Sequence, residues 1–248
     1  MRAPVNFNSL RSEHRGLLLD KYFPAKKKSE KESLLPVWKA FCASGLTPAV
    51  YQRAFERWKS TTAGWENCAR LTGKVRGRLA IGLGIENVHE IGCRLHATYG
   101  TPVIPGSSLK GLLRAGLRKM PEYAAHVTPL FGSAEESDEG GSEGHQKGAV
   151  DVFDAWWIPE SGRSGLAPDV ITVHHPSYYG GKPGAAPDDR EAPVPNHYLT
   201  VTGSFYFVFV VRAEDSKWAN FVGDAAKSFL SMEGIGAKRS SGYGRFKF

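Results

Sequence analysis

The sequence predicts an α+β fold, and three observations lead to this prediction. Residues 8–70 carry apolar side chains at helical spacing. From Lys74 onward, runs with strand character alternate with two stretches that show the period of a helix. With insertions set aside, their order is β-α-β-β-α-β, typical of a ferredoxin-like or RRM-like core of four antiparallel strands with two helices on one face. We therefore expect an N-terminal helical extension at residues 1–70 and an RRM-like domain at residues 71–248.

The helical extension is expected to contain two helices with clear apolar stripes. The first runs over about residues 29–44. The second follows Thr47, which can serve as N-cap, while Pro48 suits the first helical position. The stripe residues recur at intervals of three and four: Leu34, Val37, Trp38 and Phe41 in the first helix, and Tyr51, Phe55 and Trp58 in the second.

The expected domain opens with a strand over about residues 74–85, where apolar residues alternate with others. An extended segment leads to Pro105, and a helix follows that Ser107 or Gly106 can cap. The expected elements are helices at 107–119 and 215–232, and strands at 149–158, 198–201, 204–212 and 243–248.

Two insertions interrupt this order. Residues 132–148 are rich in Gly, Ser and acidic side chains, which is typical of a flexible surface loop. Residues 159–196 hold seven of the fifteen prolines and predict a long irregular insertion or an extended hairpin. Insertions of this length in a compact domain are usually functional or disordered.

Composition excludes several classes of protein. The chain has 248 residues, of which 41% are hydrophobic and 23% charged, as in an ordinary globular protein. It has no apolar run of about 18 residues, so we expect no membrane-spanning helix, and its start does not resemble a signal peptide. The three cysteines form no CxxC pair, which argues against a disulfide framework or a cysteine-based zinc site and favours the cytoplasm.

The net charge of +7 is unevenly distributed. Residues 1–80 hold 16 basic and 6 acidic side chains, whereas residues 131–200 hold 4 basic and 12 acidic ones. A basic body with one acidic stretch is compatible with a polyanionic partner such as nucleic acid, and also with a merely solvated surface.

The first motif joins a strand to the start of a helix and reads Ile104-Pro105-Gly106-Ser107-Ser108-Leu109-Lys110-Gly111, with Arg114 one turn later. Free N–H groups, the helix dipole, two hydroxyls and two cations together suit an anion. The spacing of a Walker P-loop is absent. A well-capped helix with a solvated basic face explains the same residues equally well.

The second motif, Gly234 to Arg245, joins the last helix to the last strand. Its four glycines allow a close approach of backbone to ligand, and Tyr243 can stack on a base. The loop also supplies cations and hydroxyls, namely Lys238, Arg239, Ser240, Ser241 and Arg245.

Taken together, the two motifs resemble the signatures of the RAMP superfamily of CRISPR effector proteins, a helix opening with Pro-Gly-Ser-Ser and a Gly-rich loop ending in Gly-Tyr-Gly-Arg. The branch most resembled is subunit six of the Cmr (type III-B) complex, and the resemblance covers about residues 70–248. The pieces that carry it are Gly82-Leu83-Gly84, Glu90 to Leu95, Tyr99-Gly100-Thr101-Pro102, Leu130-Phe131-Gly132, Asp151 to Ala155, and Asp169 to Tyr179.

The resemblance implies a structural subunit that caps the backbone of a ribonucleoprotein near the 3′ region of the CRISPR guide RNA and helps to hold the guide–target duplex in antiviral defence. Its partners would be guide RNA, complementary target RNA and other Cmr subunits, especially the backbone, small and 3′-end capping subunits, and no membrane. Tyr178 and Tyr179 in the second insertion are the candidate wedge between nucleotides, or plain packing residues. The expected RNA-binding residues are Ser107, Ser108, Lys110, Arg114, Gly236, Lys238, Arg239, Ser240, Ser241, Tyr243 and Arg245.

No catalytic residue, metal or cofactor is expected. The loop after the first strand lacks the aspartate with which related backbone subunits cut RNA, although Glu86, His89 and Glu90 could support acid–base or metal chemistry. Asp151 and Asp154 would point to opposite faces of a strand, and the adjacent His174 and His175 lack a partner for zinc.

Two alternatives stay open. One is a metal-independent CRISPR ribonuclease that processes guide precursor RNA, with His89 or His96 as general acid–base. The other is a pure protein–protein adaptor that docks through its basic N-terminal helices.

Overall fold

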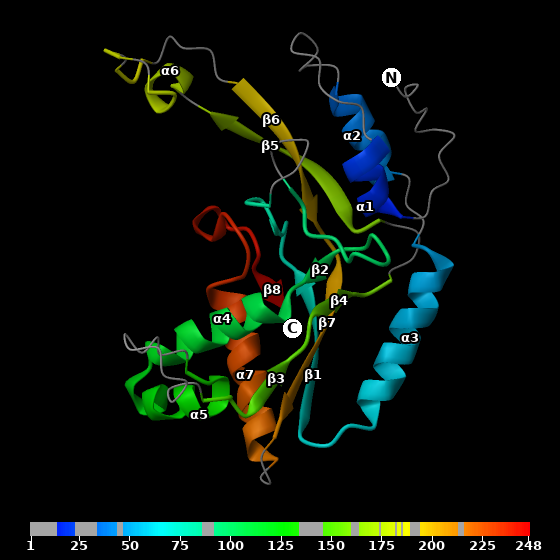
Figure 1. Ribbon diagram of the computed structural model, residues 1–248, viewed down its shortest axis with the longest axis vertical. Helices are drawn as coiled ribbons and strands as arrows, with labels where there is room; N and C mark the ends of the chain where they lie inside the picture. Colours follow the sequence, from blue (N-terminus) through cyan, green and yellow to red (C-terminus); the bar gives the residue numbers. More distant parts are fainter. Residues whose placement is uncertain are drawn as a thin grey trace, which may run out of the picture.

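The computed structural model describes residues 14–22, 34–43, 47–85, 92–133, 146–159, 164–173, 175–181, 183–184, 186–188, 194–212 and 216–248. Within these ranges the protein is an α+β structure built on a curled antiparallel sheet, as the sequence predicts (Figure 1). No helix of this part of the chain combines the length and the apolar character needed to cross a membrane.

The main sheet is centred on two long strands, β1 (Cys68–Val75) and β7 (Ser204–Val211). They pair antiparallel from Cys68 opposite Val210 to Lys74 opposite Ser204. The strand order is β2-β4-β7-β1-β8, and β3 also pairs with β7. The shorter strands are β2 (Val103–Ile104), β3 (Val150–Val152), β4 (Ala155–Trp157) and β8 (Phe246–Lys247).

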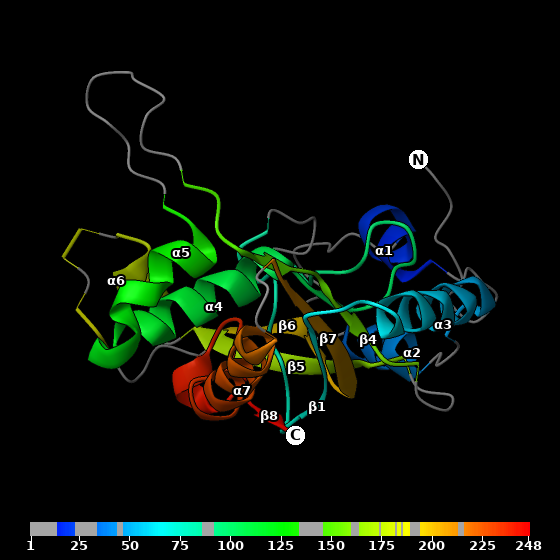
Figure 2. The same ribbon diagram turned by 90° about the horizontal axis from the view of Figure 1, so that it is seen from below.

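Helices cover both faces of the sheet, which explains why β7 is an almost unbroken run of buried residues (Figure 2). Phe205, Phe207 and Phe209 join the core under α4 (Gly106–Arg118) and α7 (Lys217–Met232). The side chains between them turn to the other face, where Tyr206 meets Phe55 of α3 (Ala49–Ala63) with ring centroids 6.1 Å apart. The alternation of a strand thus builds two hydrophobic layers from one sequence run.

The N-terminal helices pack on this body. A short α1 (Arg15–Leu17) continues into a short π-helix (Leu18–Tyr22), and α2 (Leu34–Ala43) lies against β5. The predicted stripes are confirmed at Trp38, Phe41, Tyr51 and Phe55, which are buried. The predicted cap of α3 is wrong by one position, because Pro48 rather than Thr47 is the N-cap. The division of the chain at residue 70 falls inside β1 and stays a prediction.

The second insertion contains a two-stranded hairpin. Strands β5 (Leu166–Val173) and β6 (Val194–Val201) pair over their whole length, and α6 (Pro176–Tyr179) follows β5 at the far end (Figure 1). The predicted strand at 198–201 is therefore the end of a longer strand that belongs to this hairpin. An isolated bridge between Leu79 and Val201 joins the hairpin to the body.

Two other predicted strands are displaced or divided. The first lies at Cys68–Val75 instead of 74–85. It ends just before Gly77, which adopts a left-handed conformation (φ 73°), and Leu79 and Ala80 lie beyond it in isolated bridges. The strand predicted at 149–158 is split into β3 and β4. The helices predicted at 107–119 and 215–232 are confirmed within one or two residues, as α4 and α7.

The remaining described elements are short. A 3₁₀ helix (Pro121–His126) and α5 (Val127–Phe131) follow α4, and a 3₁₀ turn (Arg239–Ser241) lies in the Gly-rich loop. Of the acidic insertion, residues 134–145 lie outside the described part of the chain.

Candidate nucleic-acid interface

The start of α4 carries the first motif and is held by a carboxylate of the protein itself. Asp154, in the turn between β3 and β4, accepts a hydrogen bond of 2.7 Å from the backbone N–H of Gly106. The structure corrects the predicted cap, since Pro105 is the N-cap and neither Gly106 nor Ser107 occupies that position. One N–H group that we expected to be free for an anion is thus already bonded, and its partner is negatively charged.

The hydroxyl groups of this motif stay accessible. Ser107 and Ser108 are exposed in the first turn of α4, whereas Lys110 is half-buried. Ser107 and Lys110 line a groove beside β3 with a volume of about 430 Å³. Arg114 is half-buried as well, and its Nε atom is buried without a hydrogen-bond partner in the described structure. The three cations of α4 therefore do not form one uniformly exposed face; Arg118 alone of the three is exposed.

The Gly-rich loop has a fixed backbone shape. Two of its N–H groups donate to the segment after β1, Ala237 N to Ala80 O at 2.7 Å and Gly244 N to Arg78 O at 2.8 Å. Glycine is needed at two of its positions, because a Cβ on Gly236 (φ 86°) would meet the carbonyl of Ala80 and one on Gly244 (φ 73°) that of Ile235. The loop therefore presents its side chains from a defined scaffold.

The two motifs, far apart in the sequence, line one groove. Figure 1 shows the red loop beside the green α4, and a groove of about 360 Å³ between them is lined by Ser108 on one side and by Gly236 and Arg239 on the other. Among the described residues, Ser240, Ser241 and Arg245 are exposed on the loop but do not line this groove.

A carboxylate inside this groove was missed by sequence reasoning. The Glu233 carboxylate, at the end of α7, forms an ion pair with Lys119 Nζ at 3.0 Å and lies 3.9 Å from Arg239 Nη1. It partly neutralises the cations there. No spacing in the sequence signals this, because α4 and α7 meet only in the folded protein.

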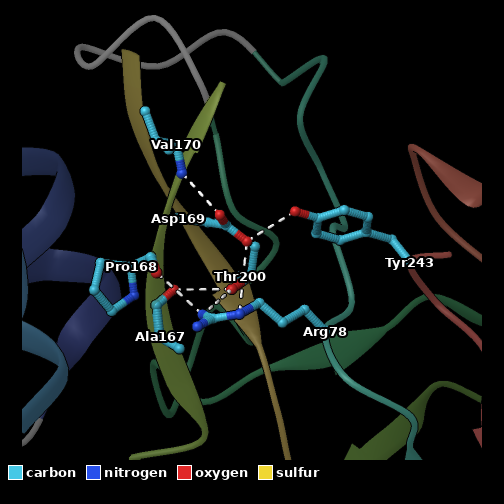
Figure 3. A network of polar contacts seen from close by, with 7 residues as sticks. All are labelled: Arg78, Ala167, Pro168, Asp169, Val170, Thr200 and Tyr243. Carbon is cyan, nitrogen blue, oxygen red and sulfur yellow. Dashed lines mark hydrogen bonds and ion pairs between the residues drawn. The ribbon is translucent and has the colours of Figure 1, made fainter. Parts of the chain in front are cut away.

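Tyr243 of the loop enters a polar network with the hairpin (Figure 3). The Tyr243 hydroxyl donates to Asp169 Oδ2 at 2.9 Å, and Arg78 Nε lies 3.6 Å from the same oxygen. Lys238 Nζ lies 5.9 Å from the ring centroid of Tyr243 and 5.5 Å from that of buried Tyr198. Tyr243, expected to stack on a base, is thus anchored at its hydroxyl and faces a cation.

The candidate wedge residues lie at the far end of the hairpin. In α6 the side chains of Tyr178 and Tyr179 are 48% and 74% exposed. Their rings meet edge to face with centroids 5.4 Å apart. They make a small aromatic surface at the far end of the hairpin, away from α4 and the Gly-rich loop (Figure 1).

His96 is packed as a structural residue. Its ring lies 4.8 Å from that of Tyr99 and 5.3 Å from that of Trp156, and its Nδ1 accepts the N–H of Thr98 at 3.1 Å. Burial lowers the pKa of His96 below its usual value. It also lines a cavity of about 740 Å³ that His14 shares.

The other acid–base candidates are separated. Asp151 forms an ion pair with Arg212 at 3.3 Å, while Asp154 accepts the hydrogen bond from the first N–H group of α4. His175 contacts the carbonyl of Asp188 at 3.0 Å. Glu86, His89, Glu90 and His174 lie outside the described residues. Within the described ranges, no three His, Cys, Asp or Glu side chains gather closely enough for a metal ion.

Comparison with known proteins identifies relatives of this architecture. The sequence profile of the RAMP superfamily matches residues 72–247. The chain is similar to the CRISPR system Cmr subunit Cmr6 of Pyrococcus furiosus, with 26% identity over 78% of this chain and 74% of the relative. Its fold is similar to that of a chain in the cryo-EM structure of the type III-B Cmr-beta complex bound to cognate target RNA. That match has a TM-score of 0.64 and 22% identity over 91% of this chain and 76% of that one.

Proposed function

Because this chain belongs to the RAMP superfamily, we propose that it is a non-catalytic, RNA-binding structural subunit of a type III-B CRISPR (Cmr) ribonucleoprotein. The observation that carries this proposal is the groove between α4 and the Gly-rich loop, which brings Ser108, Gly236 and Arg239 together from two distant motifs. Hydroxyls, a close backbone approach and cations are the groups with which proteins position a phosphate backbone. The similarity to a Cmr subunit and the fold shared with a chain of an RNA-bound Cmr complex support the assembly.

In this assembly the protein would cap the backbone near the 3′ region of the guide and help to hold the guide–target duplex. The β5–β6 hairpin supports a contact beyond the groove, since it exposes Tyr178 and Tyr179 at its far end. Exposed aromatic rings stack on bases without regard to sequence. The partners we propose are guide RNA, target RNA and neighbouring Cmr subunits, namely the backbone, small and 3′-end capping subunits, in the cytoplasm.

We also propose that the core belongs to the ferredoxin-like class. The strand order β8-β1-β7, with β3 and β4 together in the place of one broken strand, supports it. So does the position of α4 and α7 over one face. The added edge strand β2 departs from the simple four-stranded pattern.

The first test measures RNA binding by the purified full-length chain. Replacing Lys110 and Arg239 by Ala should weaken the affinity for every single-stranded RNA alike. It should also reduce the slope of log K against log salt by about one for each lost phosphate contact. Arg53→Ala, which removes an exposed cation of α3 on the other face of the sheet, is the control. Unchanged affinity and salt slope in the double variant would refute the phosphate-binding role.

The second test asks which assembly contains the protein. Purification of the tagged chain from its native host should recover several partner subunits and short RNAs that share a 5′ repeat tag. Recovery of the chain alone, without RNA, would contradict the proposal.

Cleavage of RNA distinguishes the catalytic alternative. The cavity shared by His14 and His96 is the observation that favours a ribonuclease. If the purified chain cut repeat RNA, and His96→Ala abolished the cutting, the non-catalytic role would be wrong. We expect binding without cleavage, because the Nδ1 atom of His96 is already engaged with the backbone.

A further inference from the structure

Four cations form two like-charged pairs at the β1–β8 edge of the main sheet. Lys74 lies directly opposite Lys247 in the antiparallel register, and buried Val75 opposes Phe246 beyond them. A hydrogen bond of 2.7 Å from Arg76 N to Arg245 O continues the same register. Because side chains alternate along a strand, both cation pairs project from the same face. We call Lys74, Arg76, Arg245 and Lys247 the cation ladder.

The ladder is electrostatically unfavourable in the free protein. All four side chains are exposed, and within the described part of the chain none has a carboxylate at ion-pair distance. Like charges placed directly opposite each other destabilise a sheet. By contrast, the exposed Lys227 nearby on α7 has its own acid, Asp224, at 3.0 Å. Within the described part of the chain, no carboxylate therefore offsets the repulsion among the four cations of the ladder.

Protection of a sheet edge explains only part of this arrangement. Lysines on an edge strand do discourage pairing with other chains, which accounts for Lys247 on β8. However, Lys74 belongs to β1, which lies between β7 and β8 and has no free edge at that point. A second, independent cation pair is also more than edge protection requires. An anionic ligand that spans both pairs accounts for all four residues.

A groove lined by two of the four cations, Arg76 and Lys247, offers further groups to such a ligand. It has a volume of about 680 Å³ and lies between β8 and the last turns of α7, at the rim where Figure 2 shows the chain ending. Ser228 and Ser231 line it with their hydroxyls, and Phe248, which is 40% exposed, offers an aromatic ring. Cations, hydroxyls and an accessible ring are the combination that binds single-stranded nucleic acid.

We propose that the cation ladder and its groove are a second RNA-binding surface, which takes the phosphate backbone of a single strand as it leaves the groove of α4 and the Gly-rich loop. This inference rests on the proposed function. The two surfaces are connected through Arg245, which ends the Gly-rich loop and begins the ladder. Spacing favours successive phosphates, because the two pairs are two residues apart along the strands, which is about 6.6 Å.

The test uses the purified full-length chain with Lys74→Gln and Lys247→Gln together, and a fluorescently labelled single-stranded RNA of mixed sequence. RNA affinity at low salt should fall several-fold, and the salt slope should decrease by about two. Thermal stability should stay equal or rise, because the substitutions remove repulsion. A loss of RNA affinity without a loss of thermal stability would indicate a binding role, because a structural role would lower both. Arg53→Gln with Arg57→Gln, two exposed cations of α3, is the matched control and should leave RNA affinity unchanged.

The outcomes distinguish this inference from the proposed function. If Lys110→Ala with Arg239→Ala weakens RNA binding but the ladder variant binds like the parent, the second surface is wrong and the first stands. If neither variant changes RNA binding, the proposed function itself is wrong. A ladder variant that binds RNA normally but loses a partner subunit on purification would assign this surface to an acidic protein and overturn the RNA assignment.

Discussion

At the scale of single residues, the surroundings of His96 favour its neutral form. Burial lowers its pKa, and its Nδ1 atom accepts a backbone hydrogen bond that the protonated ring could not accept. An unfolded chain has its histidines near the ordinary pKa of about 6.5. As the pH falls through that value, the unfolded state therefore takes up a proton at this position before the folded state does.

This predicts that His96 makes the protein less stable as the pH falls below about 6.5. His96→Gln keeps a polar side chain but cannot titrate, so its free energy of unfolding should depend less on pH in this range. Denaturant unfolding of both proteins between about pH 5 and pH 8 measures the difference. Parallel curves for the two proteins would show that His96 does not carry this pH dependence.

Three of the eleven residues predicted to bind RNA line the groove between α4 and the Gly-rich loop, whereas the residues that position them could not be predicted. Ser108, Gly236 and Arg239 belong to short local patterns, and the structure places them along one groove. Glu233, Arg78 and Asp169 act across the fold, and their partners come from other elements. Contacts of this kind depend on tertiary packing, which leaves no spacing in a single sequence.

At the scale of elements, the start of α4 depends on Asp154. Its carboxylate bonds the first N–H of the helix at 2.7 Å, replaces a side-chain cap and opposes the positive end of the helix dipole.

Asp154→Ala should therefore destabilise the protein by about 1 kcal/mol, the usual cost of losing a cap. Chemical denaturation monitored by circular dichroism measures this effect. Asp224→Ala, which removes an exposed acid on α7, is the control and should change little. Equal stability of the Asp154 variant and the parent would show that this bond contributes nothing to the helix.

Element types were easier to predict than element limits. The apolar faces of α4 and α7 and the Phe-, Tyr- and Val-rich run of β7 are long, strongly patterned segments. The end of β1 depends on Gly77, and the split between β3 and β4 depends on the turn that carries Asp154. The full extent of β6 was hidden by prolines that an edge-strand hairpin tolerates.

At the scale of the whole molecule, part of the basic excess in residues 1–80 holds the fold together. The Arg70 guanidinium donates to the carbonyls of Thr62 and Trp65 and ties β1 to the end of α3. Arg78 donates to Pro168 O at 3.0 Å and Thr200 Oγ1 at 3.1 Å. Lys74 and Arg76, by contrast, are exposed and available to a polyanion. Net charge alone could not separate these two groups.

Asp169 joins three parts of the molecule at one carboxylate, as Figure 3 shows. It belongs to β5 of the hairpin, pairs with Arg78 from the segment after β1 and accepts the hydroxyl of Tyr243 from the Gly-rich loop. Because the ion pair is partly exposed, its contribution to global stability is small. Its geometry nevertheless couples the Gly-rich loop to the hairpin.

Asp169→Asn should loosen the β5–β6 hairpin and the Gly-rich loop together, since an amide oxygen is a weaker acceptor than a carboxylate and attracts no cation. Hydrogen–deuterium exchange should become faster in β5 and in residues 236–244, while α4 and α7 keep their protection. Asp224→Asn serves as the control, because its exposed pair with Lys227 lies on a single helix. Faster exchange in the hairpin alone would show that the loop is held by its backbone bonds to Arg78 and Ala80 without help from Asp169.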